Sequence, residues 1–282
     1  MYMSVKRKSV LTKISLYLFY IFVSVFFLFP LLWTLSLSFK TIPELYRIPP
    51  SILPDSFAFD NYKYVIFQVN LLSGVWNSIK ITLGTIIGTL AITIPAAYCF
   101  SRMKFRFSKP LQFIILMFQM ISPLVVVVPL YRYFSMLNLL NSHTGLICIY
   151  IATSAPFQVW FLKSFIDTIP KELDEAAVID GCSRPQTVVK IILPVIAPGI
   201  FSAVLLIFIL SWSQFIIPYI LIDTPSKMPI ATMLVNLQST LSQITTHYLA
   251  SASIVAILPT IILFVFLQKY IVAALTAGAV KG

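Results

Sequence analysis

Long apolar runs constrain this chain more than any other feature of its sequence. The run from Ile14 to Phe39 contains no charged residue and exceeds the roughly 20 residues that a helix needs to cross a bilayer. Backbone groups in hydrocarbon must find their hydrogen-bond partners within the protein, which leaves helices and closed β-barrels. Barrel strands are segments of about ten residues with alternating hydrophobicity, and these continuous runs lack that pattern. The sequence therefore predicts an all-α polytopic membrane protein.

Composition and charge agree with this class. Of 282 residues, 59% are hydrophobic and 10% are charged. The net charge of +11 does not indicate nucleic-acid binding, because basic residues in membrane proteins mostly set topology and meet anionic headgroups. The three cysteines have no paired spacing, which argues against a disulfide framework or a metal site. The first apolar run is too long for a signal peptide, so we expect it to stay as the first span.

Six segments are long and apolar enough to cross the membrane. They are expected at about 14–38, 75–98, 111–132, 144–166, 195–218 and 248–268. With a cytoplasmic N-terminus, fourteen of the twenty Lys and Arg residues fall on the cytoplasmic side, as the positive-inside rule requires. The predicted organisation is a cytoplasmic N-terminus at 1–13, a six-helix transmembrane domain at 14–268 and a cytoplasmic tail at 269–282.

Two segments on the opposite side of the membrane carry their own signals. Residues 40–73 contain several prolines and are expected to form an ordered loop with a short helix at about 60–67. Residues 230–243 form an amphipathic stretch, which either packs on the surface as a connector or reaches toward something bound there.

A polar stretch at 167–194 interrupts the apolar pattern between the fourth and fifth spans. It holds five of the nine acidic residues. Pro170 suits the first turn of a helix, acidic residues follow where the helix dipole favours them, and Gly181 suits the position that closes a helix. Ser183-Arg-Pro-Gln186 matches a capping box that opens a second helix, which Pro194 interrupts. The prediction is a cytoplasmic helix–turn–helix, with a plain interfacial helix pair as the alternative.

One face of the first predicted helix carries little bulk. Leu173, Ala176, Ala177 and Asp180 follow the i, i+3, i+4, i+7 spacing that places residues on one face. The two alanines would let another surface approach the backbone closely. The spacing therefore predicts a docking face.

Motifs for catalysis or energy conversion are absent from the sequence. There is no Walker A loop, no GxSxG elbow and no HExxH, and the two histidines lie far apart. Every Asp and Glu falls in an expected loop, whereas ion-coupled carriers usually place acids or histidine inside the membrane. We therefore predict a non-enzymatic subunit without metal or cofactor that is driven by a partner. A stand-alone carrier or channel is the less favoured alternative.

The polar stretch also resembles a known signature. Glu175-Ala176-Ala177, then Gly181, then Ile191 and Leu193-Pro194 are similar, at this spacing, to the EAA loop of ABC importer permeases. Residues 96–102 and the tail 276–282 resemble the maltose-type permeases of carbohydrate importers, and the tail resembles that of the smaller maltose permease subunit. Two departures are Trp212-Ser213-Gln214-Phe215, where the family often has Trp-Asn-Glu-Phe, and Ala274-Leu275 in place of Gly-Leu.

This resemblance implies partners and a function. The chain would form the pathway for a sugar or oligosaccharide with a second permease subunit, in the cytoplasmic (inner) membrane of a prokaryote. An extracytoplasmic solute-binding protein would deliver substrate, and two cytoplasmic ATPases would hold the ATP and Mg. Import of glycerol phosphate or of an acidic saccharide is the alternative within the class, and the sequence does not identify the substrate.

The resemblance also implies site residues, with the 171–181 helix docking on the ATPase as a coupling helix. The coupling residues would be Glu172, Leu173, Glu175, Ala176, Ala177, Asp180, Gly181, Ile191, Leu193 and Pro194. The tail residues that reach the ATPase would be Gly278, Ala279, Val280, Lys281 and Gly282.

Polar and aromatic residues in the fourth and fifth spans are candidates for the substrate pathway. They are Gln158, Trp160, Ser211, Trp212, Ser213 and Gln214. Polar side chains also join helices within membranes, so helix–helix packing is the alternative for each of them.

Overall fold

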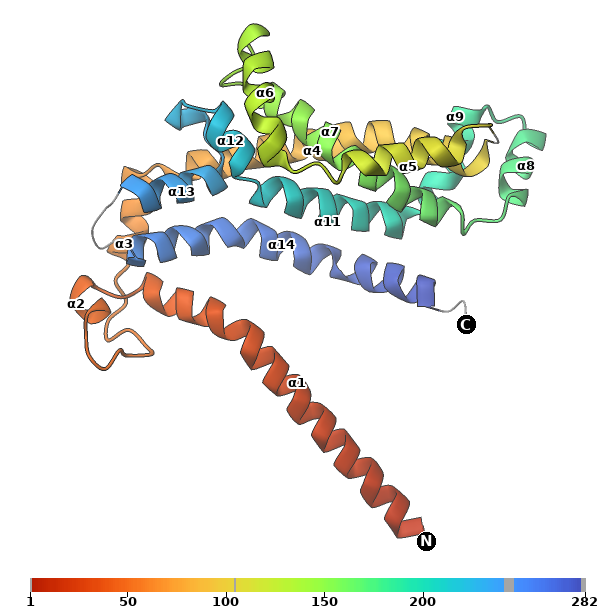
Figure 1. Cartoon of the computed structure of the whole chain (residues 1–282). Coiled ribbons are helices and arrows are strands. Elements are labelled where there is room, and N and C mark those ends of the chain that lie inside the picture. The colour runs from red at the N-terminus through yellow and green to blue at the C-terminus, as the bar shows by residue number, and fades with distance from the viewer. Residues whose placement is uncertain (1, 104, 241–245, 280–282) are drawn as a thin grey trace. The chain divides into compact units, whose positions relative to one another are not determined.

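The computed structural model describes residues 2–103, 105–240 and 246–279 (Figure 1). Regular structure within these ranges is entirely helical, which confirms the all-α class. Four helices there are long and apolar enough to cross a membrane: α1 (Tyr2–Ser38), α4 (Leu71–Arg102), α7 (His143–Ile166) and α14 (Thr246–Ala279). A pair bent by 83°, Arg184–Val195 followed by Ala197–Ser213, gives a fifth candidate.

The structure does not confirm the expected count of six spans, because the third expected span is not a single helix. Residues 111–132 fall in two shorter helices, α5 (Ser108–Phe118) and α6 (Pro123–Met136). Pro123 begins α6, and its ring disfavours a helical conformation at the preceding residue. Ser122 accordingly has an extended backbone with ψ of 132°.

The ends of the last two expected spans also differ from the prediction. Helix α11 (Ala197–Ser213) stops before Gln214, and the short helix α12 (Ile216–Leu221) follows, so residues 195–218 are not one helix. Helix α14 continues through Ala279, so the described part of the expected tail is helical. Residues Val280, Lys281 and Gly282 lie outside the described residues.

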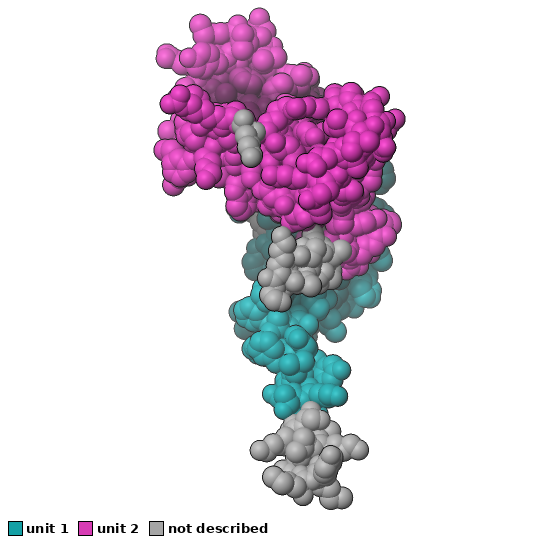
Figure 2. All heavy atoms as spheres, turned by 90° about the vertical axis from the view of Figure 1, so that its right-hand side faces the viewer, with its two compact units in different colours: residues 1–70, 237–255 teal, residues 71–236, 256–282 magenta. Residues whose placement is uncertain are grey.

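The chain divides into two compact units (Figure 2). The first unit comprises residues 1–70 and 237–255 and contains α1, α2 (Ile42–Leu45), α3 (Asp60–Lys63) and the π-helix η1 (Tyr64–Gln68). The last two confirm the short helix expected near 60–67.

Hydrogen bonds to the end of α1 order the loop in the first unit. The Ser38 carbonyl accepts from Asn61 Nδ2 at 3.0 Å and from Ser251 Oγ at 2.9 Å. The Phe39 ring packs edge-on against Phe57 and Phe59, at centroid distances of 5.3 and 5.4 Å. These contacts confirm that the loop after the first span is ordered.

The second unit comprises residues 71–236 and 256–282, and α4, α7 and α11 pack together in it (Figure 1). Helices α4 and α7 approach closely because glycine stands at their interface. A Cβ at Gly88 would lie 2.3 Å from Ile151 Cδ1, and one at Gly84 would lie 2.7 Å from Ile147 Cδ1. Small residues four apart allow this kind of close contact between membrane helices.

The segment after α12 attaches to the start of α4. It contains the 3₁₀ turn η3 (Pro225–Lys227) and α13 (Ile230–Thr240), a helix that forms the described part of the amphipathic stretch at 230–243. Asn77 Nδ2 donates to the Ser226 carbonyl at 2.8 Å, and Ser78 Oγ accepts from the Ile230 N–H at 2.8 Å.

Candidate functional site

The helix predicted at 171–181 is present as α8 (Glu172–Ile179). Figure 1 shows α8 and α9 at the end of the second unit, where α4 ends and α11 begins. Pro170 lies just before the capping residue Lys171 and not in the first turn, and its carbonyl accepts from the Leu173 N–H at 3.4 Å. Glu172, Asp174 and Glu175 occupy the first turn, where the helix dipole favours acidic side chains.

Gly181 closes α8 as the sequence predicts. Its φ is +79°, which side chains with a Cβ rarely adopt, and nothing lies within 4 Å of where a Cβ would be. The Gly181 N–H donates to the Val178 carbonyl at 3.0 Å, and the Cys182 N–H donates to the Ala177 carbonyl at 2.9 Å. This pair of bonds is the Schellman motif.

The second predicted helix is present and ends one residue after Pro194. It comprises α9 (Arg184–Thr187), the π-helix η2 (Val188–Ile192) and α10 (Leu193–Val195). The Ser183 N–H donates to Gln186 Oε1 at 2.8 Å, the backbone half of the capping box. Proline has no N–H to continue the helical ladder, and the chain bends by 83° before α11.

Asp174 ties α8 to the end of α4. Its Oδ2 accepts from Arg102 Nε at 2.8 Å, and its Oδ1 accepts from the Tyr98 hydroxyl at 2.8 Å. Arg102 Nη2 also donates to the Ile169 carbonyl at 2.9 Å. The Arg102 and Asp174 side chains are only 9% and 16% exposed. Removing one partner of such a buried pair costs about 3–5 kcal/mol, because the other charge is left uncompensated.

The sequence did not predict these contacts of Asp174 with Tyr98 and Arg102, which we call the tie. The partners are 72 residues apart, and no local pattern pairs them. The one available signal was topological, since the end of the second span and the polar stretch were both predicted on the cytoplasmic side. A second contact joins the end of α7 to the end of α4, because Asp167, the residue that caps α7, accepts from Ser101 Oγ and from Lys163 Nζ, both at 2.6 Å.

An apolar cluster lies beneath these polar contacts. It joins α4, α7, the connector before α8, η2 and the start of α11 into one packed group. Its buried members are Ala97, Tyr98, Leu162, Ile166, Ile169, Ile192, Ile196 and Ala203.

The prediction that Leu173, Ala176, Ala177 and Asp180 share one docking face is wrong for Ala177. Ala177 is only 1% exposed and faces the chain's own core, whereas Leu173, Ala176 and Asp180 are exposed. Its small size therefore serves packing within the chain, where α8 lies against α9. Glu172 and Glu175 are exposed, and Glu175 forms no ion pair with any described residue.

Two exposed apolar residues at the end of α8 were not predicted as site residues. Val178 and Ile179 are 65% and 85% exposed, more than Leu173, the other large apolar residue on the surface of α8, which is 40% exposed. The signal was present in the sequence as two adjacent β-branched residues that precede Gly181.

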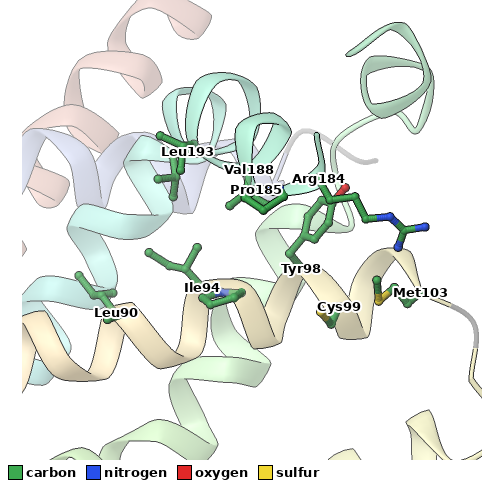
Figure 3. A pocket seen from close by; sticks show the side chains of 12 residues that line it. Leu90, Ile94, Tyr98, Cys99, Met103, Arg184, Pro185, Val188 and Leu193 are labelled. Carbon is green, nitrogen blue, oxygen red and sulfur yellow. The ribbon is translucent and has the colours of Figure 1, made fainter. Parts of the chain in front are cut away.

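Two cavities adjoin the tie between α8 and α4. The polar one, of about 380 Å³, lies between α8, α9 and the end of α4, and Lys171, Glu175 and Arg184 line it. The apolar one, of about 430 Å³, has α4 on one side and α9, η2 and α10 on the other (Figure 3). Leu193 lines the apolar cavity, while Ile191 is half-buried and Pro194 is exposed.

The candidate pathway residues do not gather on one surface. Gln158, Ser211 and Trp212 are buried, and Trp212 Nε1 donates to the Ala256 carbonyl at 3.1 Å. Trp160 is half exposed on another side of α7. The exposed Ser213 donates to the Ile209 carbonyl at 2.8 Å, and Gln214 Oε1 accepts from the Ile216 N–H at 3.1 Å.

Buried polar atoms without hydrogen-bond partners lie among α4, α7 and α11. Neither amide atom of Gln158 has a partner among the described residues, and the same holds for four hydroxyls. We call this set the polar seam, and its members are Thr82, Thr89, Thr93, Gln158 and Ser211.

Known proteins are similar to this chain over nearly its whole length. A family model described as binding-protein-dependent transport system inner membrane component matches residues 88–277. The chain is 31% identical over 278 residues to the trehalose/maltose transport system permease protein MalG of Thermococcus litoralis, covering 98% of this chain and 99% of that protein. It is 33% identical over 269 residues to the galactooligosaccharides transport system permease protein GanQ of Bacillus subtilis, covering 94% of each.

The fold also resembles a solved structure. A chain from the crystal structure of a bacterial ABC transporter involved in the import of the acidic polysaccharide alginate superposes with a TM-score of 0.80. The match covers 93% of this chain and 96% of that chain at 20% identity. At that identity the similarity shows the fold.

Proposed function

This chain belongs to the family of binding-protein-dependent transport system inner membrane components, and we propose that it forms the pathway for a sugar or oligosaccharide in an ABC importer. The observation that carries the substrate class is the near-full-length similarity to permeases named for trehalose/maltose, galactooligosaccharides and maltodextrin. In this proposal a second, related permease completes the pathway, and a solute-binding protein delivers the sugar from outside.

We propose that α8 is the coupling helix through which two cytoplasmic ATPases, which hold ATP and Mg, act on this subunit. Its exposed side carries Glu175, which forms no ion pair with any described residue, and Val178 and Ile179, which are largely exposed. A carboxylate beside an apolar tip suits a cleft that offers a basic side chain and an apolar floor. Gly181 shapes the turn, and the exposed Glu172, Ala176 and Asp180 border the contact.

The proposed orientation places both termini and the loop 167–194 in the cytoplasm. Fourteen basic residues then lie on the inner side. The tail residues proposed to reach the ATPases are Gly278 to Gly282, of which Gly278 and Ala279 belong to α14. We propose that Gln158 and Ser211, which are buried in the polar seam, belong to the substrate pathway on this subunit. Trp160 and Ser213, two further candidate pathway residues, lie on exposed surfaces.

Reconstitution of the complete importer tests this proposal. A tagged chain should co-purify with its partner permease and ATPases, and proteoliposomes with the binding protein should accumulate at least one radiolabelled sugar from a panel of maltose, trehalose, maltodextrin and galactooligosaccharide. Uptake of glycerol phosphate in place of every sugar would support the non-sugar alternative. A chain that purifies alone and transports without ATP would contradict the proposal and favour a stand-alone carrier.

A further inference from the structure

Arg102 contacts the chain both just before α8 and within its first turn. Arg102 reaches the Asp174 carboxylate inside the first turn of α8 and the Ile169 carbonyl just before it. Tyr98, one turn earlier on α4, occupies the second carboxylate oxygen. The last turn of α4 therefore fixes the position of α8 and the entry angle of its chain.

The other exit from the loop is built differently. After α9 the chain passes through the wide turn of η2 and the 83° bend before α11. π-Helical turns and proline are the usual causes of bends in helices. Among the described residues, the side-chain hydrogen bonds that join α8 to a long apolar helix are those of Asp174 to Tyr98 and Arg102 on α4.

We infer that Asp174, Tyr98 and Arg102 are positioning residues that make α8 and the inner end of α4 move as one body, which transmits ATPase closure to the pathway. This inference rests on the proposed function of α8 as a coupling helix. A movement applied at the exposed tip of α8 then displaces α4, and through the glycine interface at Gly84 and Gly88 it displaces α7 as well.

The chemistry of the tie suits transmission better than an exposed ion pair would. A largely buried charge pair is poorly screened, and a planar guanidinium holds several acceptors in fixed directions. Lysine carries the same charge on a flexible stem and cannot bridge Asp174 and the Ile169 carbonyl with the same geometry. Arg102→Lys is therefore expected to weaken transmission without removing the charge.

Substitution of Asp174 provides the first test, in the reconstituted complete importer. Asp174→Asn should leave co-purification with the ATPases intact but lower ATP-driven uptake by about 5- to 150-fold, the usual range of coupling between two sites. The uptake assay uses the radiolabelled sugar that the wild-type importer accumulates. Asp55→Asn is the matched control, because it breaks an Arg–Asp contact of the same 2.8 Å length at an exposed site, with Arg47. That control should retain wild-type uptake.

Cross-linking separates transmission from a purely structural role. Arg102→Cys is combined with Asp174→Cys in a chain in which Cys99, Cys148 and Cys182 are replaced by serine. A short bis-methanethiosulfonate reagent then joins the two positions within the same protein sample. We expect low uptake before the reaction and recovered uptake after it, with unchanged ATPase co-purification.

Three outcomes would overturn the inference. Uptake could be normal in Asp174→Asn, it could stay low after cross-linking, or no variant at these positions could assemble with the ATPases, which would give the tie a role in folding alone. Failure of the wild-type chain to bind an ATPase or to take up sugar would instead contradict the proposed function. The two failures are therefore distinguishable.

Discussion

The loop at 167–194 and the polar seam use polar side chains in opposite ways. In the loop, Asp167 and Asp174 each accept two hydrogen bonds, and Arg102 donates to both a carboxylate and a carbonyl. In the seam, Gln158 and four hydroxyls are buried without partners among the described residues. The contact between Arg102 and Asp174 is largely buried, and satisfied buried networks rigidify a structure, whereas each unsatisfied buried group costs about 1–3 kcal/mol.

The contacts of the loop suit a segment that keeps its shape, whereas the unsatisfied groups of the polar seam suit a region that rearranges. In the proposed function the loop transmits a movement, and its contacts fix it to α4. The seam lies where α4, α7 and α11 meet. We expect its polar atoms to gain partners when those helices shift during transport, because the unsatisfied arrangement is the costly one.

Glu175→Lys is expected to have the largest effect, because it reverses the charge of the exposed carboxylate proposed to meet the ATPase. Uptake should be abolished while the chain remains inserted in the membrane, since Glu175 forms no ion pair with any described residue. Glu175→Gln should retain part of the activity. Normal sugar uptake by the Lys variant in the reconstituted importer would show that this side of α8 does not dock.

Gly181→Val should have the next largest effect. A β-branched residue at a φ of +79° is strained by about 1–2 kcal/mol, which corresponds to a factor of about 5–30. Binding-protein-stimulated ATP hydrolysis should fall by that factor. Gly181→Asn is the matched control, because asparagine tolerates this backbone conformation and open space surrounds the site. Equal losses in both variants would point to a cause other than backbone strain.

Gln158→Leu tests the seam. An apolar side chain of similar size removes two unsatisfied polar atoms, so stability should rise by up to about 1–3 kcal/mol. Thermal unfolding of the detergent-solubilised importer measures this change, and uptake should fall if the amide finds partners in another state. A marked loss of stability would contradict the seam as described, because it would mean that the amide is already satisfied.

The smallest effect is expected from a pair of threonine substitutions on α4. Thr89→Val removes a buried hydroxyl without a partner and should be neutral or slightly stabilising. Thr85→Val removes a hydroxyl that donates to the Ile81 carbonyl at 2.8 Å, and should cost about 0.5–1.5 kcal/mol. The same thermal unfolding measurement compares the two, and the reverse order would argue against the seam.

Local signals in the sequence predicted the parts of the site that depend on neighbouring residues. Gly181 ends α8 because few other residues adopt its backbone conformation, and Ser183 with Gln186 caps α9. The contact between Arg102 and Asp174 joins distant segments, and no local pattern encodes it. The burial of Ala177 on α8 is not predictable from local patterns for the same reason, because it depends on packing against α9.

Proline shows why the spans could be counted only approximately. Pro95, Pro156 and Pro259 lie inside α4, α7 and α14, which continue through them, whereas Pro123 begins a new helix. Neighbouring helices can satisfy the backbone groups that a proline frees within a membrane. Whether they do so is decided by tertiary packing, which an apolar run does not reveal.

Site-directed cross-linking to the ATPase tests the central claim most directly. In a chain without native cysteines, Ile179→Cys places a thiol on the exposed tip of α8, and Ala177→Cys places one on its buried side. The account predicts that the thiol at position 179 cross-links to the ATPase in the assembled importer, and that the thiol at position 177 does not. An importer in which position 179 fails to cross-link, or reacts only with a membrane-impermeant reagent added from outside, would contradict it.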